Sequence, residues 1–410
     1  EDSYGKKGGK IVTMNNAAID KGITEIKKVE VPADWADAQD DPKTKRDVPE
    51  FIDEILIPMT RQEGDDLPVS TFLGREDGTF PSGTAAYEKR GVAVNLPKWN
   101  PKNCIQCNQC SFVCPHASIR PILVNADEKA NAPAGFDTVK AIGKGLEGLE
   151  YRTQLSPLDC MGCGNCADVC PSKEKALVMV PFAELENESE NWDYALKLPL
   201  KDKLISKNTV KGSQLAKPYV EFSGACAGCG ETPYIKLITQ LFGDRMMIAN
   251  ATGCSSIWGA AAPSMPYCTD DDGRGPSWAN SLFEDNAEYG FGMFVATKQM
   301  REKIEDCCKS LLGKDIPADL KEALEGWLQN NDDGALSRSA SEKLVAAMEG
   351  LKTADKEILS LVKEISDRKD FLVKKSVWAL GGDGWAYDIG YGGLDHVLAS
   401  GENVNILVFD

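Results

Sequence analysis

The chain has 410 residues, 14 cysteines and a formal net charge of −17 at pH 7. This length allows two or three domains with cores of their own, and the acidic balance argues against nucleic-acid binding, which needs a basic surface. No apolar run is long enough to span a membrane, no signal-peptide pattern opens the sequence, and reduced thiols are typical of the cytoplasm. We therefore expect a cytoplasmic protein that binds neither nucleic acid nor a membrane.

The first 96 residues show weak patterns. Residues 1–35 predict a strand near Lys10-Ile11-Val12 and a helix, or the end of a preceding domain. Residues 36–96 are rich in Pro, Asp and Gly and predict a linker that wraps over its neighbours. Within it, proline punctuation and apolar spacing predict one helix between Val48 and Pro58.

Two cysteine runs, about sixty residues apart, carry the strongest signal. Each has the spacing C-x2-C-x2-C-x3-C-P of bacterial two-cluster ferredoxins, in which three thiolates hold one cluster and the fourth binds the other. The predicted [4Fe–4S] ligand sets are Cys104, Cys107, Cys110 and Cys170, and Cys160, Cys163, Cys166 and Cys114. A zinc or disulfide site is the alternative, since C-x2-C by itself does not distinguish them.

The cysteine runs place a two-cluster ferredoxin-like domain of the α+β class at residues 97–183, with an insertion at 125–156. Residues 184–218 predict a charged connector. From 219 to 410, strands alternate with helices, which predicts an α/β domain with a parallel sheet. The chain begins without a methionine and ends directly after an apolar stretch, so we expect an internal segment of a longer polypeptide, with this last domain truncated at its C-terminal end.

Within the α/β region, residues 246–249 and 377–380 predict strands, and 296–369 predict helices. Two apolar stripes in these helices keep the i, i+3, i+4, i+7 spacing of a packed helix face. They consist of Leu344, Val345, Met348 and Leu351, and of Ile358, Leu361, Val362 and Ile365.

A third, looser cysteine group and a glycine turn follow. Cys226, Cys229 and Cys254 are one ligand short of a third cluster, and buried or inert thiols are an equal alternative. The stretch Gly381-Gly-Asp-Gly-Trp385 follows a strand; its glycines allow a phosphate to approach, and Asp383 suits Mg²⁺. Such turns are common in α/β proteins, so this turn alone is weak evidence.

Five stretches together resemble the pyruvate:ferredoxin (flavodoxin) oxidoreductases, a thiamine-diphosphate-dependent family, across essentially the whole chain. They are Cys104 to Pro121, Cys226-Ala-Gly-Cys-Gly-Glu-Thr-Pro233, Ala249-Asn-Ala-Thr-Gly-Cys254, Ser281-Leu-Phe-Glu-Asp-Asn-Ala-Glu288 and Gly381-Gly-Asp-Gly-Trp-Ala-Tyr-Asp-Ile-Gly390. The resemblance implies oxidative decarboxylation of pyruvate with coenzyme A to acetyl-CoA and CO2. It further implies that the α/β domain binds thiamine diphosphate, that three [4Fe–4S] clusters carry electrons to ferredoxin or flavodoxin, and that the enzyme is a homodimer.

The resemblance also assigns residues. Cys226, Cys229 and Cys254 would ligate the cluster nearest the thiamine ring, with a fourth cysteine outside this segment. Asp383 would bind Mg²⁺. The family positions around the cofactor are Glu231, Cys254, Gly382, Asp383, Gly384 and Trp385. The main catalytic residues, and the substrate and coenzyme A contacts, are expected outside this segment.

Two other functions stay open. One is a sister enzyme acting on another 2-oxo acid, because selectivity would lie outside this segment. The other is a non-catalytic iron–sulfur electron carrier whose glycine turn binds nothing. We interpret His116 and His396 as structural, and expect free thiols at Cys268, Cys307 and Cys308.

Overall fold

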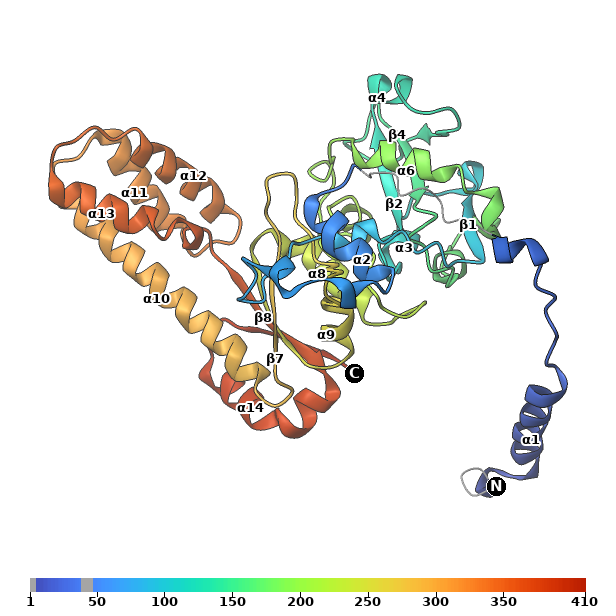
Figure 1. Ribbon diagram of the computed structural model, residues 1–410. Helices are drawn as coiled ribbons and strands as arrows, with labels where there is room; N and C mark the ends of the chain where they lie inside the picture. The colour runs from blue at the N-terminus through green and yellow to red at the C-terminus, as the bar shows by residue number, and fades with distance from the viewer. Residues whose placement is uncertain (1–4, 38–46) are drawn as a thin grey trace. The chain divides into compact units, whose positions relative to one another are not determined.

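The computed structural model describes residues 5–37 and 47–410 (Figure 1). It forms two units, Glu1–Val48 and Pro49–Asp410. In the first unit, the 3₁₀ helix η1 (Gly5–Lys7), helix α1 (Gly9–Thr24) and the 3₁₀ helix η2 (Ala33–Asp37) follow one another. None of the described side chains between 5 and 37 is buried. The strand predicted near Lys10 is wrong, because the helix-favouring Met, Ala and Lys residues that follow it continue as α1.

The second unit opens with a chain of short helices. The helix predicted from Val48 is confirmed as the π-helix η3 (Ile52–Leu56) and helix α2 (Ile57–Thr60), but it continues past Pro58, which occupies a first-turn position of α2. The 3₁₀ helices η4 (Gly64–Asp66), η5 (Val69–Phe72) and η6 (Thr84–Tyr87) follow. This segment bonds to distant parts of the unit: Thr84 Oγ1 donates to the Pro263 carbonyl at 2.6 Å, and Gly91 N donates to the Leu158 carbonyl at 2.8 Å.

The ferredoxin-like part consists of two small antiparallel sheets. Strand β1 (Asn95–Trp99) pairs with β5 (Leu177–Pro181), and β2 (Ile119–Val124) pairs with β4 (Glu150–Leu155), whose other edge carries the short β3 (Val139–Lys140). The strand before each cysteine run therefore pairs with the strand after the other run. Helices α3 (Gln109–Phe112) and α5 (Asn165–Asp168) occupy corresponding positions in the two runs.

The insertion that we expected at 125–156 is shorter than predicted, because its last residues form strand β4. Because β4 pairs along the full length of β2, residues 150–155 belong to the ferredoxin-like fold itself. The extra segment before β4 contains helix α4 (Ala126–Ala130) and β3. After this part come the 3₁₀ helix η8 (Phe182–Glu184) and helices α6 (Glu188–Leu196) and α7 (Val210–Ser213).

The α/β part has a four-stranded parallel sheet in the order β7-β6-β8-β9. Its strands are β6 (Met246–Ala251), β7 (Ser277–Ser281), β8 (Ser376–Gly382) and β9 (Asn405–Phe409), so the predicted strands at 246–249 and 377–380 and the predicted parallel sheet are confirmed. Helix α8 (Thr232–Phe242) precedes β6. Between the strands lie α9 (Cys254–Gly259), α10 (Asn286–Leu312), α11 (Ala318–Asn330), α12 (Leu336–Glu349), α13 (Lys356–Ser366), the π-helix η11 (Trp385–Ile389) and α14 (Tyr391–Ser400).

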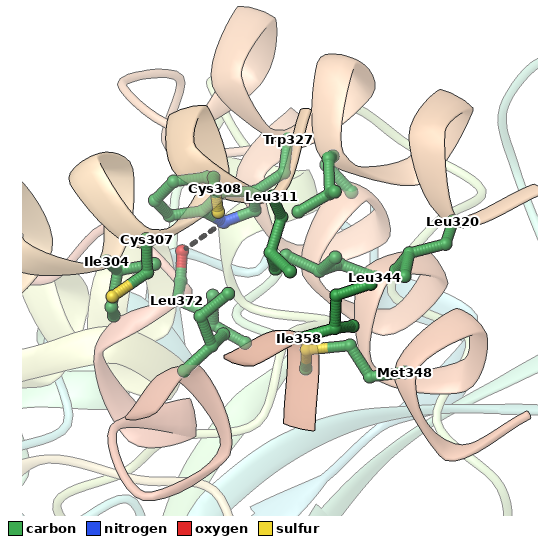
Figure 2. Close-up of a cluster of buried hydrophobic side chains, with 13 residues drawn as sticks. Ile304, Cys307, Cys308, Leu311, Leu320, Trp327, Leu344, Met348, Ile358 and Leu372 are labelled. Atoms are coloured by element: carbon green, nitrogen blue, oxygen red, sulfur yellow. Dashed lines mark hydrogen bonds between the residues drawn. The ribbon is translucent and has the colours of Figure 1, made fainter. Parts of the chain in front are cut away.

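The long helix α10 leads from the sheet to a separate helical core. In Figure 1 it extends to α11, α12 and α13, and the apolar faces of these four helices pack together. Both predicted apolar stripes contribute to this core, as expected. Figure 2 shows Cys307 and Cys308 inside it, where Trp327 Nε1 donates to the Leu372 carbonyl at 3.1 Å. These two thiols and Cys268 are buried and free, as predicted.

Among residues 5–37 and 47–410, no helix is both long enough and apolar enough to cross a membrane.

Candidate iron–sulfur and cofactor sites

The first cysteine set lines a cavity inside the ferredoxin-like part. Cys104, Cys107, Cys110 and Cys170 face this space, whose empty volume is about 330 Å³. Trp99, Tyr151 and Leu177 complete its apolar wall. We call it cavity A. These are the four cysteines that the spacing grouped, including the one contributed by the second run.

The second set lines another cavity, which we call cavity B. Its four thiols are Cys114, Cys160, Cys163 and Cys166, and the empty volume is about 370 Å³. Ile119, Leu155 and Met179 face the same space. A [4Fe–4S] cluster needs four thiolates directed into one enclosed space, so the donor set and the apolar walls of both cavities fit that group.

Left-handed backbone conformations shape both cysteine loops. The residues at corresponding positions are Gln106 (φ 57°) and Asn108 (φ 62°) in the first run, and Gly162 (φ 67°) and Gly164 (φ 82°) in the second. Glycine adopts this conformation without steric cost, whereas other residues need compensation. In the first loop that compensation comes from side-chain hydrogen bonds.

Those hydrogen bonds tie the first loop to the rest of the fold. Gln106 Nε2 donates to the Lys140 carbonyl at 2.8 Å, and Asn108 Oδ1 accepts from the Tyr151 hydroxyl at 2.9 Å. Asn108 Nδ2 donates to the Lys211 carbonyl at 2.9 Å. The segment before β4 and helix α7 therefore hold the first cysteine loop.

Burial disfavours ionisation of three of these thiols. It raises the pKa of Cys110 and that of Cys160 to about 12, with neighbouring thiols adding to the effect, and it also raises the pKa of Cys166. Such thiols ionise only when a positive charge compensates the buried thiolate, and bound iron supplies that charge. Backbone N–H groups of Gly162 and Ala176 contact the sulfurs of Cys160 and Cys170 at 3.4 Å, and N–H···S contacts of this kind help to set a cluster's potential.

All the described cysteines are free, and no group of three or more His, Cys, Asp or Glu side chains in residues 5–37 and 47–410 is arranged to hold a single metal ion.

The third cysteine group lies beside cavity B. A Cβ atom built on Gly228, between Cys226 and Cys229, would lie 3.8 Å from Cys163 Cβ. The His116 ring nitrogen Nε2 bonds to the Ala225 carbonyl at 2.9 Å, next to Cys226. Burial lowers the pKa of His116, which favours the neutral ring.

The third cysteine of this group, Cys254, is the first residue of helix α9. Glu231 Oε2 accepts from Trp258 Nε1 at 2.7 Å, which joins the loop of Cys226 and Cys229 to the helix that begins at Cys254. Cys226 and Cys254 are exposed, and Cys229 is half-buried. These thiols therefore form a looser group than those of the two cavities.

The order of the sheet predicts where a ligand crevice would lie. From β6 the chain continues to β7 on one side, and from β8 it continues to β9 on the other, so β6 and β8 flank the switch point at which α/β sheets bind ligands. Cys254 follows β6 and Asp383 follows β8, both on the carboxyl side. Asn250 and Asn286 each donate to the Leu380 carbonyl, at 3.5 and 2.9 Å, and so fix this edge.

The glycine turn fits a closely approaching ligand. A Cβ on Gly381 would lie 2.7 Å from Ala251 Cβ, which leaves room only for glycine, and one on Gly384 would lie 2.9 Å from the Phe283 ring and would displace it. A Cβ on Gly382 would make an ordinary contact, 3.8 Å from the Phe409 carbonyl oxygen; Asp383 is exposed, and the buried Trp385 Nε1 has no hydrogen-bond partner. A carboxylate beside a glycine turn suits Mg²⁺ and a diphosphate.

Several residues at these sites were not found from the sequence. Asp410 follows Phe409, which pairs with Gly382, so this residue lies at the same edge of the sheet as Asp383. Lys236 of α8 is fully buried; its Nζ donates to the Cys114 carbonyl at 2.9 Å and to the Ser111 carbonyl. Burial lowers its pKa to about 8, against the opposing effect of nearby thiols. The sequence gives no sign of these contacts, because a lysine in an amphipathic helix normally faces solvent.

Comparison with known proteins agrees with this geometry. A family model described as a 4Fe-4S dicluster domain matches residues 103–174, and one named EKR, a domain of unknown function, matches residues 37–93. All of this chain aligns with 35% of the pyruvate-flavodoxin oxidoreductase of Enterobacter agglomerans at 56% identity, and with 35% of the pyruvate:ferredoxin oxidoreductase of Moorella thermoacetica at 55% identity. This chain is homologous to one segment of these oxidoreductases.

A more distant relative is the mitochondrial pyruvate dehydrogenase [NADP(+)] of Euglena gracilis, 46% identical over 99% of the chain and 22% of that protein. The chain thus spans about a third, or less, of the length of the curated relatives it matches. The dicluster model covers both cysteine runs, so the identification of iron–sulfur sites in the ferredoxin-like part is supported independently of the cavities.

Proposed function

We propose that this chain is the electron-transfer segment, and part of the thiamine diphosphate site, of an enzyme that oxidatively decarboxylates pyruvate. The overall reaction converts pyruvate and coenzyme A to acetyl-CoA, CO2 and a proton, and reduces two one-electron acceptors. The observation that carries the proposal is the pair of cavities, each lined by four thiols and sharing ligands between the two cysteine runs. The names of the relatives supply pyruvate as the substrate.

The positions of the three cysteine groups suggest a route for electrons. The third group, Cys226, Cys229 and Cys254, adjoins the crevice at the sheet edge, and the loop of Cys226 also adjoins cavity B. Cavities A and B share the cysteine runs. A chain of three clusters in the order third group, cavity B, cavity A would lead electrons away from the crevice, one at a time.

The crevice residues are proposed to hold thiamine diphosphate. Asp383 would bind Mg²⁺, Gly382 and Gly384 would allow the diphosphate to approach, and Trp385 would line the site. Glu231 and Cys254 would lie at its margin. Thiamine diphosphate, when bound, supplies the carbanion chemistry that decarboxylation of a 2-oxo acid requires.

The acceptor is proposed to be ferredoxin or flavodoxin, docking beside cavity A. Lys102, Lys140, Lys173 and Lys175 are exposed around its cysteine loops; we call these four lysines the exit face. Ile105, between two cysteines of cavity A, is 56% exposed. An apolar contact with a basic rim is suited to an acidic carrier protein, although the chain as a whole is acidic.

Two alternative functions make different predictions for the α/β part. A sister enzyme for another 2-oxo acid would keep every feature described above, so the substrate must be found by assay. A pure electron carrier would have no use for the third cysteine group or the glycine turn. The exposed Asp383 after β8 and the exposed Cys254 after β6 favour a ligand at this edge, and hence an enzyme.

The test uses the complete enzyme, purified without oxygen, and low-temperature EPR. Pyruvate should produce a radical and partial cluster reduction, and coenzyme A should accelerate the reduction. Clusters that dithionite reduces but pyruvate leaves oxidised would reject pyruvate as the substrate; a panel of 2-oxo acids then separates a sister enzyme from a carrier.

The variant Cys254→Ala tests the third cluster in the same preparation. It should remove about four iron atoms per chain and stop turnover, because a [4Fe–4S] cluster is lost with its ligand. The matched control is Cys268→Ala, which removes a buried thiol that donates to the Pro218 carbonyl at 3.4 Å and should keep all the iron. Unchanged iron in Cys254→Ala would favour the carrier.

A further inference from the structure

The segment matched by the domain of unknown function contains a turn, Glu88-Lys89-Arg90, that contacts two cysteine-bearing segments at once. Lys89 has φ 46°, a left-handed conformation that side-chain-bearing residues seldom adopt. Such conformations persist where surrounding contacts impose them, and they concentrate at functional positions. The contacts of this turn therefore indicate what it does.

Lys89 reaches the segment that opens the ligand set of cavity B. Its Nζ donates to Asp159 Oδ2 at 2.6 Å, directly before the ligand Cys160. The Asp159 side chain is only 2% exposed, whereas that of Lys89 is 35% exposed. Lys89 thus brings a positive charge to a buried carboxylate that adjoins a cluster ligand.

Uncharged donors also bind the Asp159 carboxylate and the backbone around it. Ser156 Oγ donates to Asp159 Oδ2 at 2.6 Å, and Ser118 Oγ donates to the Asp159 carbonyl at 2.8 Å. Gly91 N, next to the turn, donates to the Leu158 carbonyl at 2.8 Å. These bonds would keep Asp159 in position if Lys89 were replaced.

Arg90 reaches the segment before Cys226. Its guanidinium donates to the carbonyls of Phe222 and Ser223, at 3.2 and 3.0 Å, and pairs with Glu88. The Lys89 ammonium lies 5.2 Å from the centre of the Phe222 ring. The two basic residues of the turn therefore connect the segment before Cys160 to the segment before Cys226.

We propose that the Glu88-Lys89-Arg90 turn positions cavity B against the third cysteine group, and that Lys89 tunes the potential of the cluster in cavity B by compensating the charge of Asp159. The proposal rests on the cluster assignment proposed above. A thiolate-bound [4Fe–4S] cluster becomes more negative on reduction, so a nearby uncompensated carboxylate disfavours the reduced form. Lys89 and Arg90 are positioning residues and touch no substrate.

The test measures midpoint potentials by EPR-monitored redox titration of the complete enzyme. Lys89→Met should shift the potential of the cluster in cavity B to a more negative value, because it removes a positive charge beside the segment of Cys160. Asp159→Asn should shift it to a more positive value, because it removes a negative charge from the same place. The double variant should return close to the unaltered potential, and Lys89→Arg should retain it.

Lys314→Met is the matched control. Lys314 is 32% exposed and bonds to Glu357 at the same 2.6 Å, but it lies in the helical part, which contains none of the cysteines assigned to clusters. It should leave all potentials unchanged. Iron content and thermal unfolding of each variant are measured alongside, so that a lost cluster is not mistaken for a shifted one.

The signs of the shifts decide the outcome. A purely structural role would move both single variants in the same direction, or neither, and either result overturns the proposal. If the unaltered enzyme contains no reducible clusters, the proposed function itself is wrong and this inference falls with it. If its clusters are normal and only the opposite shifts are missing, the proposed function stands without this role of the turn.

Discussion

The two parts of the second unit hold their candidate sites in opposite ways. In the ferredoxin-like part, eight thiols face two enclosed cavities. In the α/β part, Cys226, Cys254 and Asp383 are exposed near the edge of the sheet. The first arrangement is complete within this chain, whereas the second is open, as we expect for a site that other parts of a larger enzyme cover. Substitutions in the ferredoxin-like part should therefore remove clusters, whereas substitutions in the α/β part should weaken cofactor binding and leave the clusters of cavities A and B intact.

The largest effect is expected inside the closed part. Cys163→Ala removes a ligand from cavity B, so we expect the loss of about four iron atoms per chain and of electron transfer, because the other thiols cannot hold a stable cube. Iron and acid-labile sulfide analysis with EPR measures both. Cys307→Ala, in the helical core, serves as the control, and this variant should contain as much iron as the unaltered protein. A full iron complement in Cys163→Ala would contradict the assignment of cavity B.

A change in the open part should spare the clusters. Asp383→Asn removes the charge proposed to bind Mg²⁺, so thiamine diphosphate should bind about tenfold more weakly or worse, a loss of about 1.4 kcal/mol or more. Calorimetric titration at several Mg²⁺ concentrations measures this, and iron analysis should show no change. Asp395→Asn, an exposed carboxylate on α14, is the control. Equal affinity in both variants would argue against Asp383 as the Mg²⁺ ligand.

The glycine turn allows a smaller, steric test of the same edge. Gly381→Ala places a Cβ 2.7 Å from Ala251 Cβ, so strands β6 and β8 must shift and the protein should lose about 1–3 kcal/mol of stability. Chemical denaturation of the apoprotein measures the change. Gly392→Ala, inside α14 with nothing within 4 Å, should gain about 0.5–1 kcal/mol instead. A similar effect of both substitutions would mean that close packing at Gly381 is unimportant.

The sequence predicted the parts whose signal is local. The cysteine spacing grouped the residues that line each cavity, since three ligands of each set lie within seven residues of one another. The strands at 246–249 and 377–380 and the apolar stripes of the helices also follow from short-range patterns. These features depend on no distant partner.

Strand β4 was missed because the three buried side chains in its middle are polar. Arg152, Thr153 and Gln154 are all buried, which a strand reading based on apolar alternation does not anticipate. The structure satisfies them through a distant partner: Arg152 and Gln154 donate to Glu188 Oε2 at 2.6 and 2.9 Å. The contacts of Lys89, Lys236 and Asp410 were missed for the same reason, because each depends on the tertiary fold.

The smallest effect is expected at the exit face, where cavity A meets its proposed acceptor. Lys102→Glu reverses one exposed charge, which should raise the KM for an acidic carrier protein about two- to tenfold at low salt and less at high salt, because screening weakens surface charges. Reduction of a small uncharged dye by the same enzyme should not change, since the clusters are untouched. Lys369→Glu, in the helical part, applies the same change of net charge and should have little effect. If both substitutions raise the KM equally, the carrier responds to total charge, and electrons leave by no particular face.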